Sequence, residues 1–454
     1  MSKRNFILLI IILSLVVIVI IGFLYFRKLP TAGEDSGEGT NFLSQFNPFG
    51  TSPQKPPTTT PPPVVDVSGY EPGAGEETQN AKLMKVSSMP IAGFAVYMKE
   101  RLKNMPVPPV PPVEPPPVVE VKKGKGTSTK APLPVAPPTE FVAAVRYVEK
   151  AKGNIYQTFA DKIEERKFSV TTIPRVYEAY FGNHGESVLM RYLKIGSDTI
   201  ETFIGNLPKE RLGEDTTGNN EVKGSFLPNN VKDISLSPDT SQVFYLFNSG
   251  DSMIGTILNF LDNKKVQVFD SPFTEWLSQW GSDKIITLNT KPSANTPGYI
   301  YTIDLFNKNV TKTLGDINGL TTLLSLNGKL ILYGNNNLSL NIFHTDTKNG
   351  DALAVRTLPE KCVWNSGSTT VYCAVPKSID PGQYPDSWYQ GEVSFRDQLW
   401  KIDIESGNAS IILDPATSVG GEEIDGIKLA VDENENYLFF VNKKDSFLWK
   451  LELK

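Results

Sequence analysis

The sequence predicts an all-β fold, a β-propeller of seven blades, and two recurring patterns lead to this prediction. The first is a motif made of an apolar residue, an aromatic residue, any residue, an Ile, Leu or Thr, and an acid. Its copies are "IYTID" at 300–304, "IFHTD" at 342–346, "LWKID" at 399–403 and "LWKLE" at 448–452. The second is a polar turn between two apolar runs, centred near residues 184, 239, 283, 327, 367 and 433. Successive copies lie 40 to 66 residues apart, a spacing typical of four-stranded propeller blades.

The clearest of these hairpins is "DISLSPDTSQVFYLF" at 233–247. Pro238 fixes a φ angle suited to a turn, and Asp239 can hydrogen-bond its own backbone two residues on. A Ser-Pro-Asp turn followed by an apolar strand resembles the WD40-like repeats of TolB-type propellers. The resemblance spans residues 81–454 through this one short motif. It implies a fold and does not specify an activity.

The repeats divide residues 81–454 into blades. Strands of the first blade are predicted near Ile91–Tyr97, Val142–Glu149, Ile155–Ala160 and Phe168–Thr172. Later blades are predicted to begin near Val176, Val231, Phe273, Leu320, Cys362 and Ile424. Only three strands are predicted for the last blade. We therefore expect its fourth strand to be a segment that begins at Lys82 and pairs with Phe447–Leu453, because a closed ring leaves no open sheet edge. Six or eight blades, and a short helix at Ala92–Asn104, are the alternatives.

Residues 1–28 differ from the rest of the chain and predict a membrane anchor. The segment Phe6–Phe26 has 21 residues without a charge, enough for a helix to cross about 30 Å of hydrocarbon. A cleaved signal peptide has a shorter apolar core, about 7–15 residues, and a pilin-like start would carry a glutamate there. Lys3 and Arg4 favour an N-terminus inside the cytoplasm. We therefore expect a single-pass protein of the cytoplasmic membrane with its C-terminal domain outside the cytoplasm.

Two segments have the composition of spacers that cannot bury a core. Residues 29–80, rich in Pro, Thr and Gly, predict a disordered tether between the anchor (1–28) and the propeller (81–454). A second segment, about 105–138, holds "PVPPVPPVEPPP" and "KKGKGTSTK" and is predicted to be an insertion within the first blade. We interpret it as a stiff, solvated loop. A ligand for a proline-binding domain, or a basic patch that touches an anionic polymer, is the alternative.

Composition bears on several classes of function. Of the 45 basic residues, four lie in residues 1–28, which leaves 41 against 50 acidic residues, a net charge near −9. This charge argues against a nucleic-acid partner. His184 and His344 have no ligand spacing around them, so we predict no metal and no cofactor. No nucleophile elbow, phosphate-binding glycine loop or sialidase-type box occurs, and no catalytic residue is assigned. Lone Asp and Glu residues are interpreted as turn caps.

The two cysteines predict a disulfide. In "CVWNSGSTTVYC" a four-residue turn at 366–369 places Cys362 directly opposite Cys373 in a hairpin. Cβ atoms of such pairs lie about 4.5–5.5 Å apart, and a disulfide prefers about 3.8 Å, so a modest adjustment is needed. Disulfides form in extracytoplasmic compartments, in agreement with the predicted topology. Two buried thiols are the alternative.

One long irregular segment, Pro376–Gln398, joins the second and third strands of the sixth blade, where a short turn would suffice. It combines aromatic and charged residues, as partner sites do. The residues predicted to bind a partner are Tyr384, Asp386, Trp388, Tyr389 and Arg396. The alternative is that this loop folds down and plugs the central channel.

Loop position predicts which face of the propeller is functional. Loops that join strands one–two and three–four of a blade share one face, and loops that join strands two–three or successive blades share the other. The tether and the Pro-rich insertion belong to the first face, which we expect to look toward the membrane. The 376–398 loop and "NTKPSANTPG" at 289–298 belong to the second, which we expect to be presented outward.

These observations favour a non-enzymatic, membrane-anchored propeller that acts as a protein-binding or scaffold module at the cell envelope. The expected partners are the membrane, through residues 6–26, and an envelope protein or polymer. The soluble part is expected to be a monomer. The alternative is a propeller enzyme, a lactonase- or sialidase-type hydrolase with a carboxylate-lined site at the channel mouth.

Overall fold

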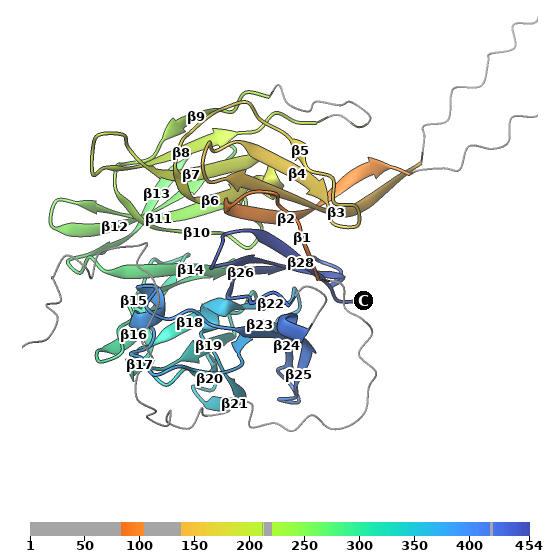
Figure 1. Ribbon diagram of the computed structural model, residues 1–454. Helices are drawn as coiled ribbons and strands as arrows, with labels where there is room; N and C mark the ends of the chain where they lie inside the picture. Colours follow the sequence, from red (N-terminus) through yellow and green to blue (C-terminus); the bar gives the residue numbers. More distant parts are fainter. Residues whose placement is uncertain (1–82, 104–137, 211, 213–219, 418–420) are drawn as a thin grey trace, which may run out of the picture. The chain divides into compact units, whose positions relative to one another are not determined.

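The computed structural model describes residues 83–103, 138–210, 212, 220–417 and 421–454. In these ranges the chain forms seven four-stranded antiparallel sheets, and each sheet is one blade of a propeller (Figure 1). The predicted fold is therefore confirmed with its seven blades. The predicted anchor, tether and Pro-rich insertion fall outside the described residues. Within the described ranges, no helix combines the length and apolar character needed to cross a bilayer.

Strands follow one another along the chain within each blade. Blade one contains β2 (Ile91–Leu102), β3 (Thr139–Glu149), β4 (Ile155–Phe159) and β5 (Arg166–Lys167). Blade two contains β6 (Val176–Gly182), β7 (Ser187–Leu193), β8 (Ile200–Asn206) and β9 (Lys223–Phe226). Blade three contains β10 (Val231–Leu236), β11 (Gln242–Ser249), β12 (Ser252–Asn259) and β13 (Lys265–Ser271). Blade four contains β14 (Trp276–Ser282), β15 (Ile285–Thr290), β16 (Pro297–Asp304) and β17 (Val310–Asn318).

The remaining blades follow the same order, except that the last takes a strand from the N-terminal side. Blade five contains β18 (Thr321–Leu324), β19 (Leu330–Gly334), β20 (Ser339–His344) and β21 (Gly350–Arg356). Blade six contains β22 (Cys362–Trp364), β23 (Thr370–Pro376), β24 (Asp397–Asp403) and β25 (Ala409–Leu413). Blade seven contains β26 (Gly426–Val431), β27 (Tyr437–Asn442), β28 (Leu448–Glu452) and β1 (Leu83–Lys85). Short helices occur at Asn183–Gly185, Pro359–Lys361, Asp386–Tyr389 (α2) and Pro415–Thr417.

The ring closes through β1. Leu83 pairs with Leu451 and Lys85 pairs with Trp449, as the spare N-terminal segment was expected to do (Figure 1). The chain then turns directly into blade one, with Val86 N–H donating to the Leu448 carbonyl at 2.8 Å. First strands of most neighbouring blades contact one another, and β2 contacts β26, so the last blade meets the first. Closure therefore gives the outer edge of β28 a partner and removes an open sheet edge.

The recurring motifs correspond to defined strands. The four "IYTID"-type copies form the third strands β16, β20, β24 and β28. The acids that end the first three copies accept hydrogen bonds from the turns that follow: Asp304, for example, accepts from the Phe306 N–H at 2.9 Å. The Ser-Pro-Asp turn joins β10 to β11, and Asp239 accepts from the Ser241 N–H at 3.1 Å. The second strand β23 is buried along its whole length because neighbouring blades cover both of its faces.

Two details differ from the sequence prediction, and one alternative is excluded. The fourth strand of blade one is Arg166–Lys167 and not Phe168–Thr172. Phe168 is completely buried in the core between blades one and two, so its apolar character reflects packing between blades. Blade four begins at Trp276 and not at Phe273, which is 72% exposed. Residues 92–102 lie in strand β2, which excludes the alternative of a helix there.

The disulfide is confirmed. Cys362 in β22 pairs directly with Cys373 in β23, and their sulfur atoms are bonded. Both residues are buried in a cluster that includes Trp364 and Trp400. The crosslink therefore joins the innermost two strands of blade six within the hydrophobic core.

We expect β1 to contribute strongly to stability. A chain that begins at residue 91 lacks β1 and exposes the edge of β28, and it should melt more than about 5 °C below a chain that begins at residue 81, because several kcal/mol of pairing and burial are lost. Calorimetry of the two chains measures this difference. Melting temperatures within a degree or two of each other would contradict closure by β1.

The disulfide yields a second prediction. Thiol labelling of denatured, unreduced protein should detect no free cysteine, and a Cys362→Ala/Cys373→Ala variant should lose about 2–3 kcal/mol of unfolding free energy for a loop of this length. A single Cys373→Ala variant, which leaves one free thiol, is the labelling control. Recovery of two labelled thiols from the native protein would contradict the crosslink.

Candidate functional site

The most elaborate irregular structure in the described residues is the loop that joins β23 to β24, residues 377–396. It lies on the face that carries the strand two–three loops and the blade-to-blade connections, which we call the connection face. Asp386 accepts a hydrogen bond from the Ala294 N–H of blade four at 2.6 Å. Lys443 of blade seven donates to the Trp388 carbonyl. The loop of blade six therefore reaches connections that belong to blades four and seven.

The underside of the loop is a small aromatic core. Tyr384, Trp388 and Phe395 are 4%, 5% and 2% exposed. The Trp388 and Phe395 rings stack with their centroids 6.1 Å apart. Leu338 of blade five and Leu358, which precedes β22, complete this cluster. The loop is thus a packed part of the fold, and its inner surface is held by hydrophobic burial.

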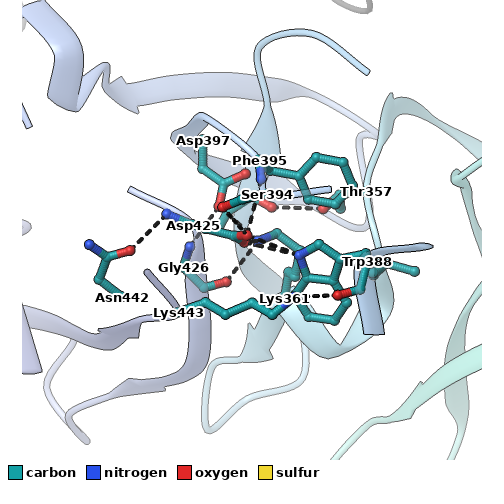
Figure 2. A network of polar contacts seen from close by, with 12 residues as sticks. Thr357, Lys361, Trp388, Ser394, Phe395, Asp397, Asp425, Gly426, Asn442 and Lys443 are labelled. Carbon is teal, nitrogen blue, oxygen red and sulfur yellow. Dashed lines mark hydrogen bonds and ion pairs between the residues drawn. The ribbon is translucent and has the colours of Figure 1, made fainter. Parts of the chain in front are cut away.

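Beneath these rings lies a buried ion network (Figure 2). Lys361 is completely buried, and its Nζ lies 2.5 Å from Asp425 Oδ1 and 2.8 Å from Asp397 Oδ2. Asp425 also accepts from Trp388 Nε1 at 3.0 Å and from the Phe395 N–H at 3.0 Å. The network therefore links the segments that lead into β22 and β26 to Trp388 and Phe395 of the aromatic core.

The two carboxylates differ in charge environment. Burial raises the pKa of Asp397 to about 6, against the opposing charge of Lys361. Its Oδ1 atom is buried without a hydrogen-bond partner. Burial also acts to raise the pKa of Asp425, but the charge of Lys361 and hydrogen bonds from Phe395 and Trp388 outweigh it, and the pKa is lowered. Asp425 is therefore the stable counter-ion of Lys361, and Asp397 is the carboxylate that protonates first.

The structure separates the predicted partner residues into two groups. Tyr384 and Trp388 are buried under the loop, as expected if the loop packs down onto the face. Tyr389 is 39% exposed and its hydroxyl donates to Glu360 at 2.6 Å. The Arg396 side chain is 69% exposed and pairs with Glu423 at 3.0 Å. Asp386 is half-buried. A partner-binding role remains a prediction, and Tyr389 and Arg396 are the members with accessible side chains.

The ion network is not predicted from the sequence. Lone acids are interpreted there as turn caps, and for Asp397 and Asp425 that interpretation is wrong, because both are buried and form ion pairs with a lysine. Lys361 is separated from Asp397 by 36 positions and from Asp425 by 64. No local spacing connects the three residues. The available signal in the sequence is a lysine, Lys361, directly before the innermost strand of blade six. This signal does not identify the carboxylates that pair with the lysine.

A second polar group lies near the innermost strands of blades two, three and seven. Glu178 in β6 pairs with Arg191, and Lys428 in β26 lies 4.0 Å from Glu178. Asp233 in β10 accepts from the Ser278 hydroxyl at 2.7 Å, and burial raises its pKa to about 6. Each of these carboxylates already has a protein partner. In the described residues, no three His, Cys, Asp or Glu side chains gather as a metal-ligand group.

No protein-family model and no curated protein matches the chain. Among solved structures, TolB from Acinetobacter baumannii aligns with a TM-score of 0.38 and 12% identity over 57% of this chain and 59% of that one. Oligogalacturonate lyase from Vibrio parahaemolyticus aligns with a TM-score of 0.47 and 7% identity over 69% and 86% of the two chains. An oligogalacturonate lyase in complex with manganese gives 0.44 and 8% over 68% and 85%. The chain spans less than two thirds of the TolB chain.

Removal of the lysine from the ion network should destabilise the protein strongly. Lys361→Met leaves two carboxylates buried without their counter-ion and should cost about 3–5 kcal/mol of unfolding free energy. Lys377→Met is the control, because its ion pair with Asp414 involves a lysine side chain that is 57% exposed and should change stability by less than about 1 kcal/mol. Equal denaturation midpoints for the two variants would contradict the network.

Asp397 should give the stability a distinctive pH dependence. Its folded pKa lies above its unfolded value, so the folded state binds more protons between about pH 4 and pH 6. The Asp397 contribution therefore falls as pH rises through this interval, by on the order of 2–3 kcal/mol. Asp397→Asn should remove that component, which denaturation at pH 4, 5, 6 and 7 can measure. Parallel stability curves for the two proteins would contradict it.

Proposed function

We propose that the protein is a membrane-anchored, extracytoplasmic β-propeller that acts as a non-enzymatic protein-binding or scaffold module at the cell envelope. The uncharged segment 6–26 supports the anchor. The disulfide between Cys362 and Cys373 supports an oxidising compartment. The packed loop of blade six supports a binding role for the connection face.

The proposal rests on one observation, the fixed conformation of the blade-six loop. Trp388 and Phe395 fix its inner side through the ion network, so its outer side has a defined conformation before any partner arrives. A preorganised surface loses less conformational entropy on binding. Tyr and Arg are enriched among residues that dominate binding energy, and Tyr389 and Arg396 are exposed on this loop. We therefore assign the partner surface to the outer side of the loop, with these two residues at its centre.

Site-specific crosslinking tests the assignment. A photoreactive residue placed at position 389 or 396 in the full chain, in its native membrane, should give one discrete adduct of constant mass. The same residue at Phe306 is the control, because Phe306 is 99% exposed in the strand three–four turn of blade four, on the opposite face. Adducts that are equally abundant from 306, or absent from 389 and 396, would count against a partner surface on this loop.

Membrane attachment is tested separately. The full chain should sediment with membranes and resist extraction by high salt, and a chain that lacks residues 1–28 should be released, because burial of the apolar segment provides the attachment. Protease added to intact cells whose outer layers are permeabilised should reach the propeller if it is extracytoplasmic. Protection of the propeller until the cytoplasmic membrane is ruptured would overturn the proposed topology.

A further inference from the structure

The turn between the third and fourth strands of blade four carries a motif that the proposed function does not use. Residues 304–311 read "DLFNKNVT", and the last three match the N-x-Ser/Thr motif that accepts Asn-linked glycans. We propose that Asn309 carries such a glycan and that its first sugar packs on the ring of Phe306. The proposal rests on the proposed extracytoplasmic location, because these glycans belong to exported domains.

Backbone hydrogen bonds hold the turn in one conformation. Asp304 N–H donates to the Asn309 carbonyl at 3.0 Å, and Lys308 N–H donates to the Asp304 carbonyl at 2.8 Å. The Asp304 carboxylate accepts from the N–H groups of Phe306 and Asn307 at 2.9 and 3.0 Å. Lys308 has a φ angle of 60°, the left-handed conformation that ends many hairpin turns. Phe306 and Asn309 are therefore presented from a fixed backbone.

The groups that glycan transfer requires are accessible. Asn309, Val310 and Thr311 are all exposed. Within the described part of the chain, neither the Asn309 side-chain amide nor the Thr311 hydroxyl has a hydrogen-bond partner. Asn309 directly precedes β17, and residues two positions apart along a strand face the same side. Because β17 is the last strand in the order of its sheet, no further strand of the blade covers the amide or the hydroxyl.

Phe306 supplies an aromatic surface three residues before the acceptor. It is 99% exposed, more than any other large apolar residue that the structure describes. The C–H face of a sugar is apolar and can lie flat on such a ring, which removes apolar surface of both groups from water. The fully exposed ring and the acceptor asparagine of one rigid turn therefore form a surface suited to the first sugar of a glycan.

Blades five and six repeat the same turn and show what is particular to blade four. His344 N–H donates to the Asn349 carbonyl in blade five, and Asp403 N–H donates to the Asn408 carbonyl in blade six, both at 2.9 Å. The residue before each asparagine again has a left-handed φ, 60° and 71°. Blade five has Asp351 where the motif requires a hydroxyl. Its turn therefore has the right shape without the acceptor motif.

The other two copies of the motif lack one of the two features. Asn408 is followed by Ser410, but Glu405 stands where blade four has its phenylalanine. The third copy begins at Asn337, and its middle residue, Leu338, is completely buried. A buried middle residue keeps the folded chain from entering the active site of a transferase. Only the blade-four turn combines the motif, full exposure and an adjacent ring.

The reaction needs one co-substrate, a glycan linked through diphosphate to a lipid. A bond forms between Asn309 Nδ2 and C1 of the first sugar, and the bond from C1 to the diphosphate oxygen breaks. The amide gives up one proton, and the lipid diphosphate is the leaving group. Strand three–four turns lie on the face opposite the connection face, so a glycan there leaves the blade-six loop free to bind.

Glycopeptide mass spectrometry of the full chain, isolated from its native membrane, tests the site. Most copies should carry a glycan on Asn309, at least about twofold fewer should carry one on Asn408, and Asn349 should carry none. A glycan on Asn337 would contradict selection by the folded surface. Unmodified Asn309 in all copies would overturn the proposal.

Two variants made in the same cells separate the motif from the turn. Thr311→Ala should abolish the glycan at Asn309, because it removes the hydroxyl of the motif and leaves the asparagine in place. Thr347→Ala is the matched control, since Thr347 is an exposed threonine of the equivalent blade-five turn, and it should leave the glycan unchanged. A glycan that survives Thr311→Ala would overturn the assignment.

The contact with the ring is tested by a double-mutant cycle of melting temperatures. The glycosylated chain should melt about 1–3 °C above the Thr311→Ala chain, and this difference should vanish in the Phe306→Ser background. An equal difference in both backgrounds would overturn the packing of the sugar on Phe306. Protease access reports on topology separately. An unmodified Asn309 in a propeller that the protease reaches would overturn the glycan and leave the proposed location intact.

Discussion

Pairing of β1 with β28 is the contact on which the rest of the propeller depends. Blades bury their sheet faces only against neighbouring blades, so a ring that fails to close leaves both an edge and a face in water. Leu83 and Lys85, near the start of the described chain, supply the missing strand to residues that precede the C-terminus by only a few positions. The same closure brings β26 against β2.

The two faces of the ring have different structures because the chain alternates direction within each blade. One face carries the start of β1 and the end of the long β2–β3 ribbon, whose last pair joins Leu102 to Thr139. The connection face carries the loop of blade six and the ion network.

The blade-six loop shows how a surface element can be both rigid and irregular. Its backbone does not pair with a neighbouring strand. Its conformation is instead fixed by the burial of aromatic rings and by one lysine with two carboxylates. A buried ion network does not itself favour stability over a well-packed apolar core, but it is directional. Lys361 can satisfy Asp397 and Asp425 only when the starts of β22 and β26 are in place, which ties the loop conformation to the correct assembly of blades six and seven.

The sequence alone determined the propeller, its seven blades, the closing strand and the disulfide. The blades and the disulfide follow from local patterns: strand-length apolar runs, turn residues and a hairpin that sets Cys362 opposite Cys373. The closing strand follows from the number of strands, because the last blade has one too few. Only the tertiary structure decided that Trp388 is buried, that Phe168 belongs to a core between blades, and that Lys361 meets Asp425. Those contacts join residues of different blades, and the periodicity of one strand carries no information about which side chain of the next blade will lie against it.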